Sequence, residues 1–171
     1  QIILIARDNE RGLASAMVRG YNNAQGEYLG SMDADLAHDP KYLPEMIKLL
    51  NSDSADFIIG SRYLPESQFL GKPLLNRIAS IVGQFVIKIL LGVSVNDTSN
   101  NYRVFKREIW KKIKSRLHPD GNIMLTEIVN QAQKNNYRIK EIPILYQERR
   151  VGKSKLNIFA ETIRFCKNIV K

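Results

Sequence analysis

Two aspartates, separated by a single residue, follow a short apolar stretch of the chain. They are Asp33 and Asp35, in the segment YLGSMDADLAHDP that covers residues 28–40. Carboxylates at this spacing can point toward one hard cation, and Mg²⁺ or Mn²⁺ held by one or two carboxylates completes its coordination with water and phosphate oxygens. Such a metal would neutralise charge that develops on a diphosphate leaving group. The simpler interpretation is that both aspartates belong to a loop or a helix cap. His38, beside Asp39, is expected at the surface.

Cationic side chains elsewhere in the chain could hold the anionic part of such a substrate. Arg62 ends the strand-like segment GSRY, and its guanidinium offers fork-shaped donors that suit a phosphate, although a salt bridge to a nearby acid is an equal interpretation. The segment RRVGKSK, residues 149–155, has four cations around Gly152 and could wrap an anion, or it could be a solvated basic loop. The polar run DTSNNYR, residues 97–103, is typical of a turn that leads into a strand.

The elements that must position these residues alternate between strand and helix patterns, which is typical of an α/β fold with a mainly parallel sheet and flanking helices. The expected strands cover residues 2–6, 27–33, 55–61, 102–105 and 140–146. The expected helices cover residues 12–24, 40–50, 73–92, 106–114 and 123–135, with a last helix from residue 156. In such a sheet, the strand before Asp33 delivers both aspartates to the carboxyl edge, where α/β proteins bind their ligands.

Two of the expected helices have a composition that suits an interface. Residues 73–92 have the apolar density of a long helix, but Asn76, Arg77, Gln84 and Lys88 interrupt it too often for a membrane span. This segment is therefore predicted to be a buried or interfacial helix. The last helix has an apolar stripe opposite a polar, partly basic face, so it packs on its own core or lies on a membrane or a partner.

Length and charge limit the classes of protein to which the chain can belong. With 171 residues, 44% of them apolar and 25% charged, it fits one globular domain that covers residues 1–171. The formal net charge of +9 favours an anionic partner, which could be a nucleic acid, a phosphorylated small molecule or an anionic membrane. The single cysteine, Cys166, excludes an internal disulfide framework and favours the cytoplasm. The common phosphate-loop, dinucleotide, zinc-protease and serine-hydrolase motifs are absent from the sequence.

In their order along the chain, the motifs resemble those of the inverting family 2 glycosyltransferases, and most closely the branch of dolichyl-phosphate mannose synthases and polyprenyl-phosphate sugar transferases. The matching segments are Arg11-Gly-Leu with Gly20, Ala24 and Gly26, then MDADLAHDP, GSRY, DTSNNYRVFKRE, the helix of Glu127, and EIPILYQERRVGKSKL. The resemblance implies a Rossmann-like A-type glycosyltransferase fold, in which the sheet holds the nucleotide and a metal at its carboxyl edge.

The resemblance also implies residue roles and an activity. Asp33 would lie near the diphosphate of the nucleotide sugar, and Asp35 would bind Mg²⁺ or Mn²⁺. Phosphates of the donor or the acceptor would be held by four cations, Arg62, Arg103, Arg149 and Lys155. The expected reaction is inverting transfer of mannose or another hexose from a GDP- or UDP-sugar to dolichyl or undecaprenyl phosphate, at the cytoplasmic face of a membrane. Because a lipid phosphate is already negatively charged, positioning and electrostatics would supply the rate.

The chain departs from the family pattern at three places, and two alternatives accompany the prediction. Ala37 and Ile81 stand where relatives often have a polar side chain and an arginine, and the first strand-helix units of the family are expected to be missing, which would leave the donor site incomplete. In the first alternative the acceptor is a sugar hydroxyl in polysaccharide or glycoconjugate synthesis, and Glu127 would be the base. In the second the chain is an inactive scaffold or a basic nucleic-acid-binding module. Nucleic acid is not an expected partner, because no recognition motif is present.

Overall fold

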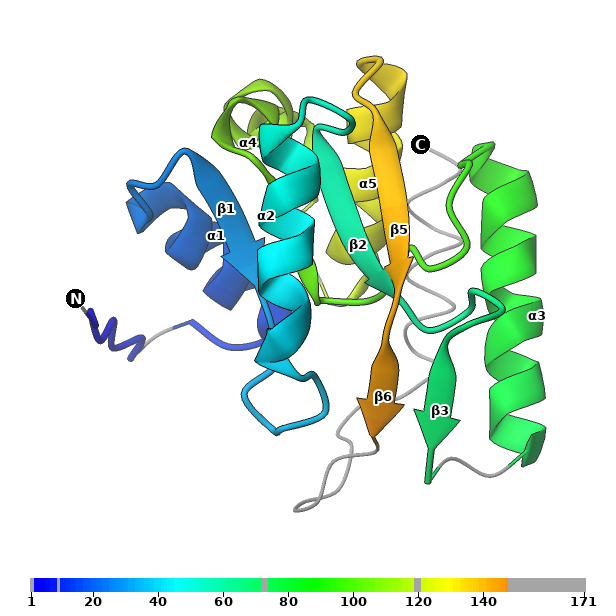
Figure 1. Cartoon of the computed structure of the whole chain (residues 1–171). Helices are drawn as coiled ribbons and strands as arrows, with labels where there is room; N and C mark the ends of the chain where they lie inside the picture. Colours follow the sequence, from blue (N-terminus) through cyan, green and yellow to red (C-terminus); the bar gives the residue numbers. More distant parts are fainter. Residues whose placement is uncertain (1, 9, 72–73, 119–120, 148–171) are drawn as a thin grey trace.

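A mixed sheet of four strands forms the centre of the part of the chain that the structure describes (Figure 1). This computed structural model describes residues 2–8, 10–71, 74–118 and 121–147. The strands are β1 (Tyr28–Ser31), β2 (Phe57–Ser61), β4 (Arg103–Lys106) and β5 (Ile139–Pro143), in the order β1-β4-β2-β5. β2 and β5 are parallel, whereas β4 is antiparallel to both β1 and β2. Three strands of this sheet therefore share one direction, but the reversed β4 lies between two of them, so two of the three pairings are antiparallel and the sheet is mixed rather than mainly parallel.

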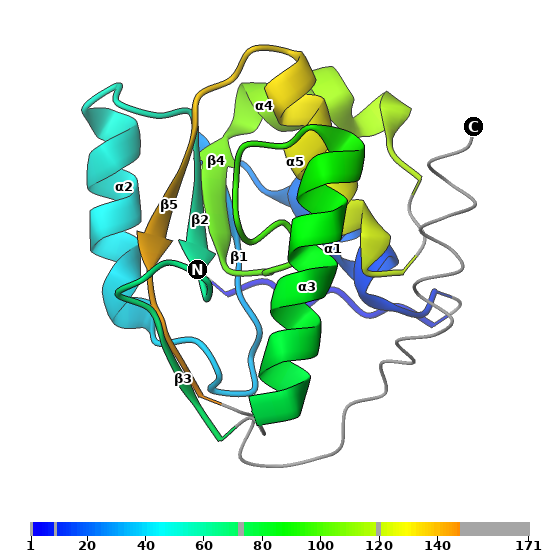
Figure 2. The same ribbon diagram turned by 90° about the vertical axis from the view of Figure 1, so that its right-hand side faces the viewer.

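Helices cover both faces of this sheet (Figure 2). One face carries α2 (Leu43–Asn51), which follows the 3₁₀ turn η1 (Pro40–Tyr42), and the other carries α1 (Leu13–Asn23), α4 (Arg107–Ile113) with the 3₁₀ turn η2 (Lys114–Arg116), and α5 (Ile123–Lys134). Because β2 is covered on both sides, each residue of its FIIGS sequence is buried. Ile58 belongs to the cluster of Met46 and Leu50 on α2, whereas Phe57 and Ile59 belong to the cluster on the opposite face.

Local sequence signals account for where several of these elements begin. The Asp39 side chain accepts a hydrogen bond from the Lys41 amide at 3.0 Å, and Pro40 occupies the first position of η1, where a missing amide proton costs nothing. The helices predicted at residues 12–24, 40–50, 106–114 and 123–135 are all present. The prediction at 73–92 is also confirmed as a helix, α3 (Leu74–Leu91).

A second, two-stranded parallel sheet extends beyond the end of the main one. It pairs β3 (Gln68–Leu70) with β6 (Leu145–Gln147). The strand predicted at 140–146 is thus divided into β5 and β6, because Ile144 donates its amide to Ser61 O at 3.2 Å and accepts from the Gln68 amide at 3.2 Å. The chain changes partner at this point, from β2 to β3. No strand was expected at 68–70, since its sequence lacks an apolar run.

The strand predicted at residues 2–6 is not formed in the described structure. Ile2 is 99% exposed and Leu4 is 93% exposed, and no strand edge pairs with this segment. An apolar run indicates a strand only if a neighbouring strand can take up its backbone groups, and none does so here. The last helix, expected from residue 156, lies outside the described residues.

Candidate functional site

The predicted site residues meet at one edge of the main sheet because of the directions of its strands. β1, β2 and β5 run the same way, so their carboxyl ends lie together (Figure 1). Asp33 and Asp35 follow β1, and Arg62 follows β2. β4 runs in the opposite direction, so the segment before it, residues 95–102, reaches the same edge. This segment is called the β4-entry loop below.

Asp33 is held by a side chain of the β4-entry loop. Asn101 Nδ2 donates to Asp33 Oδ1 at 2.8 Å, across 68 positions of sequence. Asp35 closes its own turn, because its Oδ1 accepts from the Ala37 amide at 3.1 Å, and Leu36 between them has a φ of 65°. The structure thus places both aspartates in an ordered turn at the end of β1 rather than in a helix cap.

His38 lies buried beneath this turn and contacts its backbone. It is therefore not the surface residue that its sequence context suggested. It is only 3% exposed, and its ring lies 5.1 Å from that of Tyr102 and 5.5 Å from that of Tyr146, centroid to centroid. Burial lowers the pKa of this imidazole, which favours the neutral ring. Its Nδ1 accepts from the Asp33 amide at 3.4 Å, and its Nε2 has no hydrogen-bond partner among the described residues.

Arg62 forms a buried ion pair with Asp97. Its Nε donates to Asp97 Oδ2 and its Nη2 to Asp97 Oδ1, each at 2.8 Å, and Nη2 also reaches Ser99 Oγ at 2.9 Å. Asp97 is fully buried and the Arg62 side chain is 16% exposed. Burial alone would lower the pKa of Arg62, but the Asp97 carboxylate offsets it and the pKa is raised. The salt-bridge interpretation of Arg62 is therefore confirmed, and phosphate contact stays a prediction.

Arg103 has a structural position that differs from the predicted phosphate contact. It is completely buried, and its guanidinium donates to the carbonyl oxygens of Asn100, Thr98 (3.1 Å) and Leu125 (2.9 Å). Burial lowers the pKa of Arg103 to about 10, which still leaves it charged at neutral pH. Since its donors are directed at carbonyl groups inside the protein, Arg103 braces the β4-entry loop from within.

The β4-entry loop is further anchored by residues that sequence reasoning did not single out for the site. Glu141 of β5 accepts from the Asn96 amide and from the Asp97 amide, each at 2.9 Å, and Thr98 Oγ1 lies 3.0 Å from Thr126 Oγ1 of α5. The Asp, Thr, Ser and Asn content of residues 97–101 was the available signal. Such a composition is also typical of a turn, and only the reversed direction of β4 brings these residues to the carboxyl edge.

The described residues could bind a divalent cation only if a substrate phosphate supplied further oxygen ligands. In the part of the chain that the structure describes, no group of three or more His, Cys, Asp or Glu side chains could hold a metal. Asp33 and Asp35 supply two carboxylates, and the buried Asn101 Oδ1 is an oxygen without a hydrogen-bond partner in the described part of the chain. Mg²⁺ and Mn²⁺ accept such a sparse oxygen set when a diphosphate and water complete the shell.

Three predicted residues remain, Arg149, Lys155 and Glu127. Arg149 and Lys155 lie outside the described residues. Glu127 is on α5, where its Oε1 lies 3.0 Å from His118 Nδ1 and its Oε2 accepts from the His118 amide at 2.8 Å.

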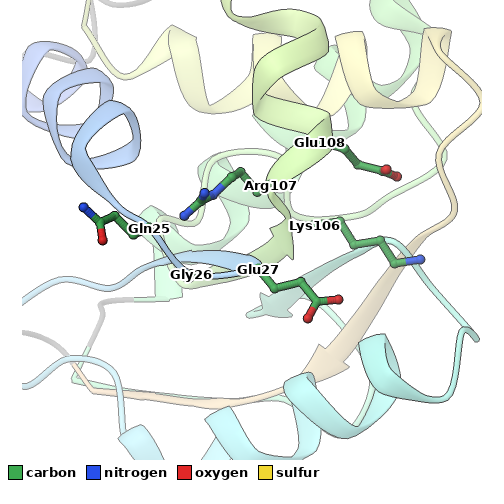
Figure 3. A pocket seen from close by; sticks show the side chains of 6 residues that line it. All are labelled: Gln25, Gly26, Glu27, Lys106, Arg107 and Glu108. Carbon is green, nitrogen blue, oxygen red and sulfur yellow. The ribbon is translucent and has the colours of Figure 1, made fainter.

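A hollow of about 400 Å³ lies at the opposite end of the sheet, where β1 begins and β4 ends (Figure 3). It is open and has charges of both signs, so it offers no selective site for an anion. The residues that line it are Gln25, Gly26, Glu27, Lys106, Arg107 and Glu108.

The sequence matches a known family and several characterised relatives. The model of the family described as Glycosyl transferase family 2 matches residues 1–114. The chain is 29% identical over 161 residues to a polyprenol monophosphomannose synthase of Mycolicibacterium smegmatis, 30% over 157 residues to a dolichol-phosphate mannosyltransferase of Pyrococcus furiosus, and 27% over 158 residues to an undecaprenyl-phosphate mannosyltransferase of Micrococcus luteus. These alignments cover 92%, 90% and 90% of the chain but only 60%, 43% and 64% of the relatives.

Solved structures show the same fold. Glucosyl-3-phosphoglycerate synthase of Mycobacterium tuberculosis superposes with a TM-score of 0.64 at 14% identity, over 94% of this chain and 54% of that one. A second structure of that synthase, in complex with Mn²⁺, uridine diphosphate and phosphoglyceric acid, superposes with a TM-score of 0.60, also at 14% identity, over 94% of this chain and 52% of that one. The predicted A-type glycosyltransferase fold is thereby confirmed.

Proposed function

Because the chain belongs to glycosyl transferase family 2, we propose that it forms the catalytic core of an enzyme that transfers a hexose from a nucleotide sugar to a polyprenyl phosphate. The observation that carries the proposal is the meeting of Asp33, Asp35 and Arg62 at the carboxyl edge of the sheet, with Asn101 holding Asp33. The names of the three relatives support mannose as the sugar and a lipid phosphate as the acceptor.

The proposed reaction needs positioning and charge more than a general base. A phosphate oxygen of the acceptor attacks the anomeric carbon opposite the nucleoside diphosphate, the bond from that carbon to the leaving oxygen breaks, and the configuration inverts. Asp33 and Asp35 would hold Mg²⁺ or Mn²⁺, which supplies positive charge to the departing GDP or UDP. Asn101 orients Asp33, and the Arg62 and Asp97 pair fixes the neighbouring turn.

The surface of α3 supports a membrane as the place where the acceptor is met. Its outward side chains are mainly apolar, and these are well exposed, with Phe85 at 62% and Ile89 at 64%. Among the described residues, none of the helices has both the length and the apolarity that crossing a bilayer requires. The exposed apolar side chains of α3 suit contact with the surface of a membrane, and the positive net charge of the chain suits anionic lipids on its cytoplasmic face.

The cations of residues 149–155 provide the test of the acceptor. Arg149→Ala and Lys155→Ala should each lower transfer to polyprenyl phosphate about ten- to hundred-fold in the natural protein that carries this sequence, because each removes a charge-assisted phosphate contact. Binding of GDP or UDP should change little. Lys112→Ala, on the exposed side of α4, is the matched loss of a cation and should leave transfer unchanged.

Equal losses in all three variants would indicate a general effect of charge and contradict a phosphate site. Full activity of both loop variants would instead favour a hydroxyl acceptor. In this second candidate Glu127 is the base, and the contacts of His118 with both of its carboxylate oxygens would hold it in one orientation. Glu127→Gln would then abolish transfer, whereas the lipid-phosphate mechanism expects it to retain activity.

A further inference from the structure

α3 is amphipathic in the reverse of the usual sense. Its less exposed positions recur at helical spacing and are mainly polar, whereas the outward positions are mainly apolar. The inward stripe consists of Ser80, Gln84, Ile87, Lys88 and Leu91, and the exposed apolar residues are Leu75, Ile78, Ile81, Val82, Phe85, Val86, Ile89 and Leu90. A helix that packs on its own core would show the opposite pattern.

The polar stripe of α3 is bonded to the β4-entry loop. Gln84 Oε1 accepts from the Thr98 amide at 3.1 Å and from Thr98 Oγ1 at 3.0 Å, while Gln84 Nε2 donates to Ser99 Oγ at 2.8 Å. One turn later, Lys88 Nζ donates to Asn96 Oδ1 at 3.0 Å. The amide of Gln84 thus contacts two consecutive loop residues with both of its polar atoms. Figure 2 shows α3 standing in front of this loop, beside the sheet.

From Gln84, hydrogen bonds together with the backbone of the β4-entry loop lead to the candidate site. Ser99 Oγ also receives Arg62 Nη2, and Arg62 is paired with Asp97. The carbonyl of Thr98 receives Arg103, which also binds the carbonyl of Asn100. Asn101, the next residue, holds Asp33. The position of α3 and that of the Asp33 carboxylate are therefore connected through the β4-entry loop.

We infer that Gln84 is a positioning residue that makes donor binding respond to contact of α3 with an anionic lipid surface. The inference rests on the proposed function in one respect, namely that the acceptor is a lipid and is met at a membrane surface. The occupant of the outer face is taken as lipid because that face is mainly apolar, carries the exposed cation Arg77 and no acidic residue, and belongs to a chain with a net charge of +9. Contact with lipid would hold α3 in one place, and Gln84 would pass that constraint to Thr98 and Ser99.

The test measures nucleotide affinity with and without vesicles, so it does not depend on any acceptor. GDP and UDP are titrated calorimetrically with Mn²⁺ into the natural protein that carries this sequence, alone and with vesicles of phosphatidylcholine and phosphatidylglycerol. Wild type should bind the preferred nucleotide more tightly when vesicles are present. Gln84→Leu should sediment with vesicles as wild type does but lose this response, with affinity roughly three- to ten-fold below that of vesicle-bound wild type.

Two further variants keep the outcome specific. Gln84→Glu retains the acceptor for Thr98 and should recover part of the vesicle response, whereas Gln25→Leu, the same change on an exposed residue at the opposite end of the sheet, should respond fully. A normal vesicle response in Gln84→Leu, or no response in wild type, would overturn the inference. Failure of transfer to polyprenyl phosphate with an intact vesicle response would instead count against the proposed function alone.

Discussion

At the scale of single residues, the candidate site depends on contacts between side chains that are distant in sequence. Asp33 receives its hydrogen bond from Asn101, and Arg62 is paired with Asp97. In each case a group at the end of a forward strand meets one from the loop that enters the reversed strand β4. Asp35 instead bonds within its own turn, to the Ala37 amide. The two aspartates are therefore close in sequence, but different groups fix their positions.

We predict that Asp35→Asn removes the metal dependence of nucleotide binding, because a neutral amide is a poor ligand for Mg²⁺ or Mn²⁺. Calorimetry with GDP and UDP, with Mn²⁺ and after chelation, measures the effect. The matched control is Asp39→Asn four residues later, where asparagine can still cap η1. A metal response in Asp35→Asn equal to that of wild type would contradict a role for Asp35 in metal binding.

At the scale of elements, β2, α2 and the β5–β6 segment pack so closely that a side chain larger than hydrogen does not fit at Gly60. A Cβ built there would lie 3.0 Å from Ile144 Cγ2, 3.1 Å from Met46 Cε and 3.2 Å from Tyr102 Cδ1. The Gly60 carbonyl also accepts from the Asn100 side chain. Close packing at this glycine therefore fixes how β2 and the β4-entry loop approach each other just before Arg62.

Gly60→Ala is expected to lower the free energy of unfolding by about 1–3 kcal/mol, since an extra methyl group must displace well-packed neighbours. Urea denaturation measures the change. Gly30→Ala on β1 is the matched control, because its Cβ would meet Arg103 O and Val104 Cγ2 at an ordinary 3.6 Å. That variant should be neutral or slightly stabilising. Equal stability of the two variants would show that the Gly60 contact adapts at little cost.

At the scale of the whole molecule, the two ends of the sheet differ in their polar residues. The carboxyl edge carries the candidate site, whereas the opposite edge is held by an ion-pair network. Asp56 accepts from Lys106 Nζ at 2.8 Å and from Arg138 Nη2 at 2.9 Å, and Asp53 joins both cations. The network ties the end of β4 to the starts of β2 and β5. Hydrogen bonds from Arg138 hold the pKa of Asp56 well below its usual range, against the opposing effect of burial.

This lowered pKa predicts how stability depends on pH. The unfolded chain protonates Asp56 near pH 4, so the stability that the carboxylate contributes is complete above about pH 5 and is lost as pH falls through the lower folded pKa. Asp56→Asn should cost roughly 2 kcal/mol at pH 7, and the difference from wild type should shrink toward pH 2. Urea denaturation at several pH values measures it. Asp53→Asn is the control: because the Asp53 side chain is 71% exposed, this change should lower stability much less than Asp56→Asn does. A pH-independent deficit in Asp56→Asn would contradict this account.

Much of the architecture follows from local sequence patterns. The helices at 12–24, 40–50 and 73–92 were predictable from periodicity and capping, since those signals act within a few residues of each other. The strand-end position of Asp33 and Asp35 was also predictable, and the ordered motifs were sufficient to identify the family. The apolar run at residues 2–6 shows the limit of this reasoning, because strand formation also requires a partner strand.

The tertiary structure alone decided which residues meet at the site. The sequence indicated a strand at β4 but not its reversed direction, and that direction brings Asn101 to Asp33 and Asp97 to Arg62. Burial, which depends on the packing of distant elements, turned Arg103 and His38 into internal supports. The polar residues of α3 had the same ambiguity: their spacing excluded a membrane span, but only the fold showed that Gln84 contacts the β4-entry loop. Contacts of this range depend on chain direction and register, which short sequence windows do not contain.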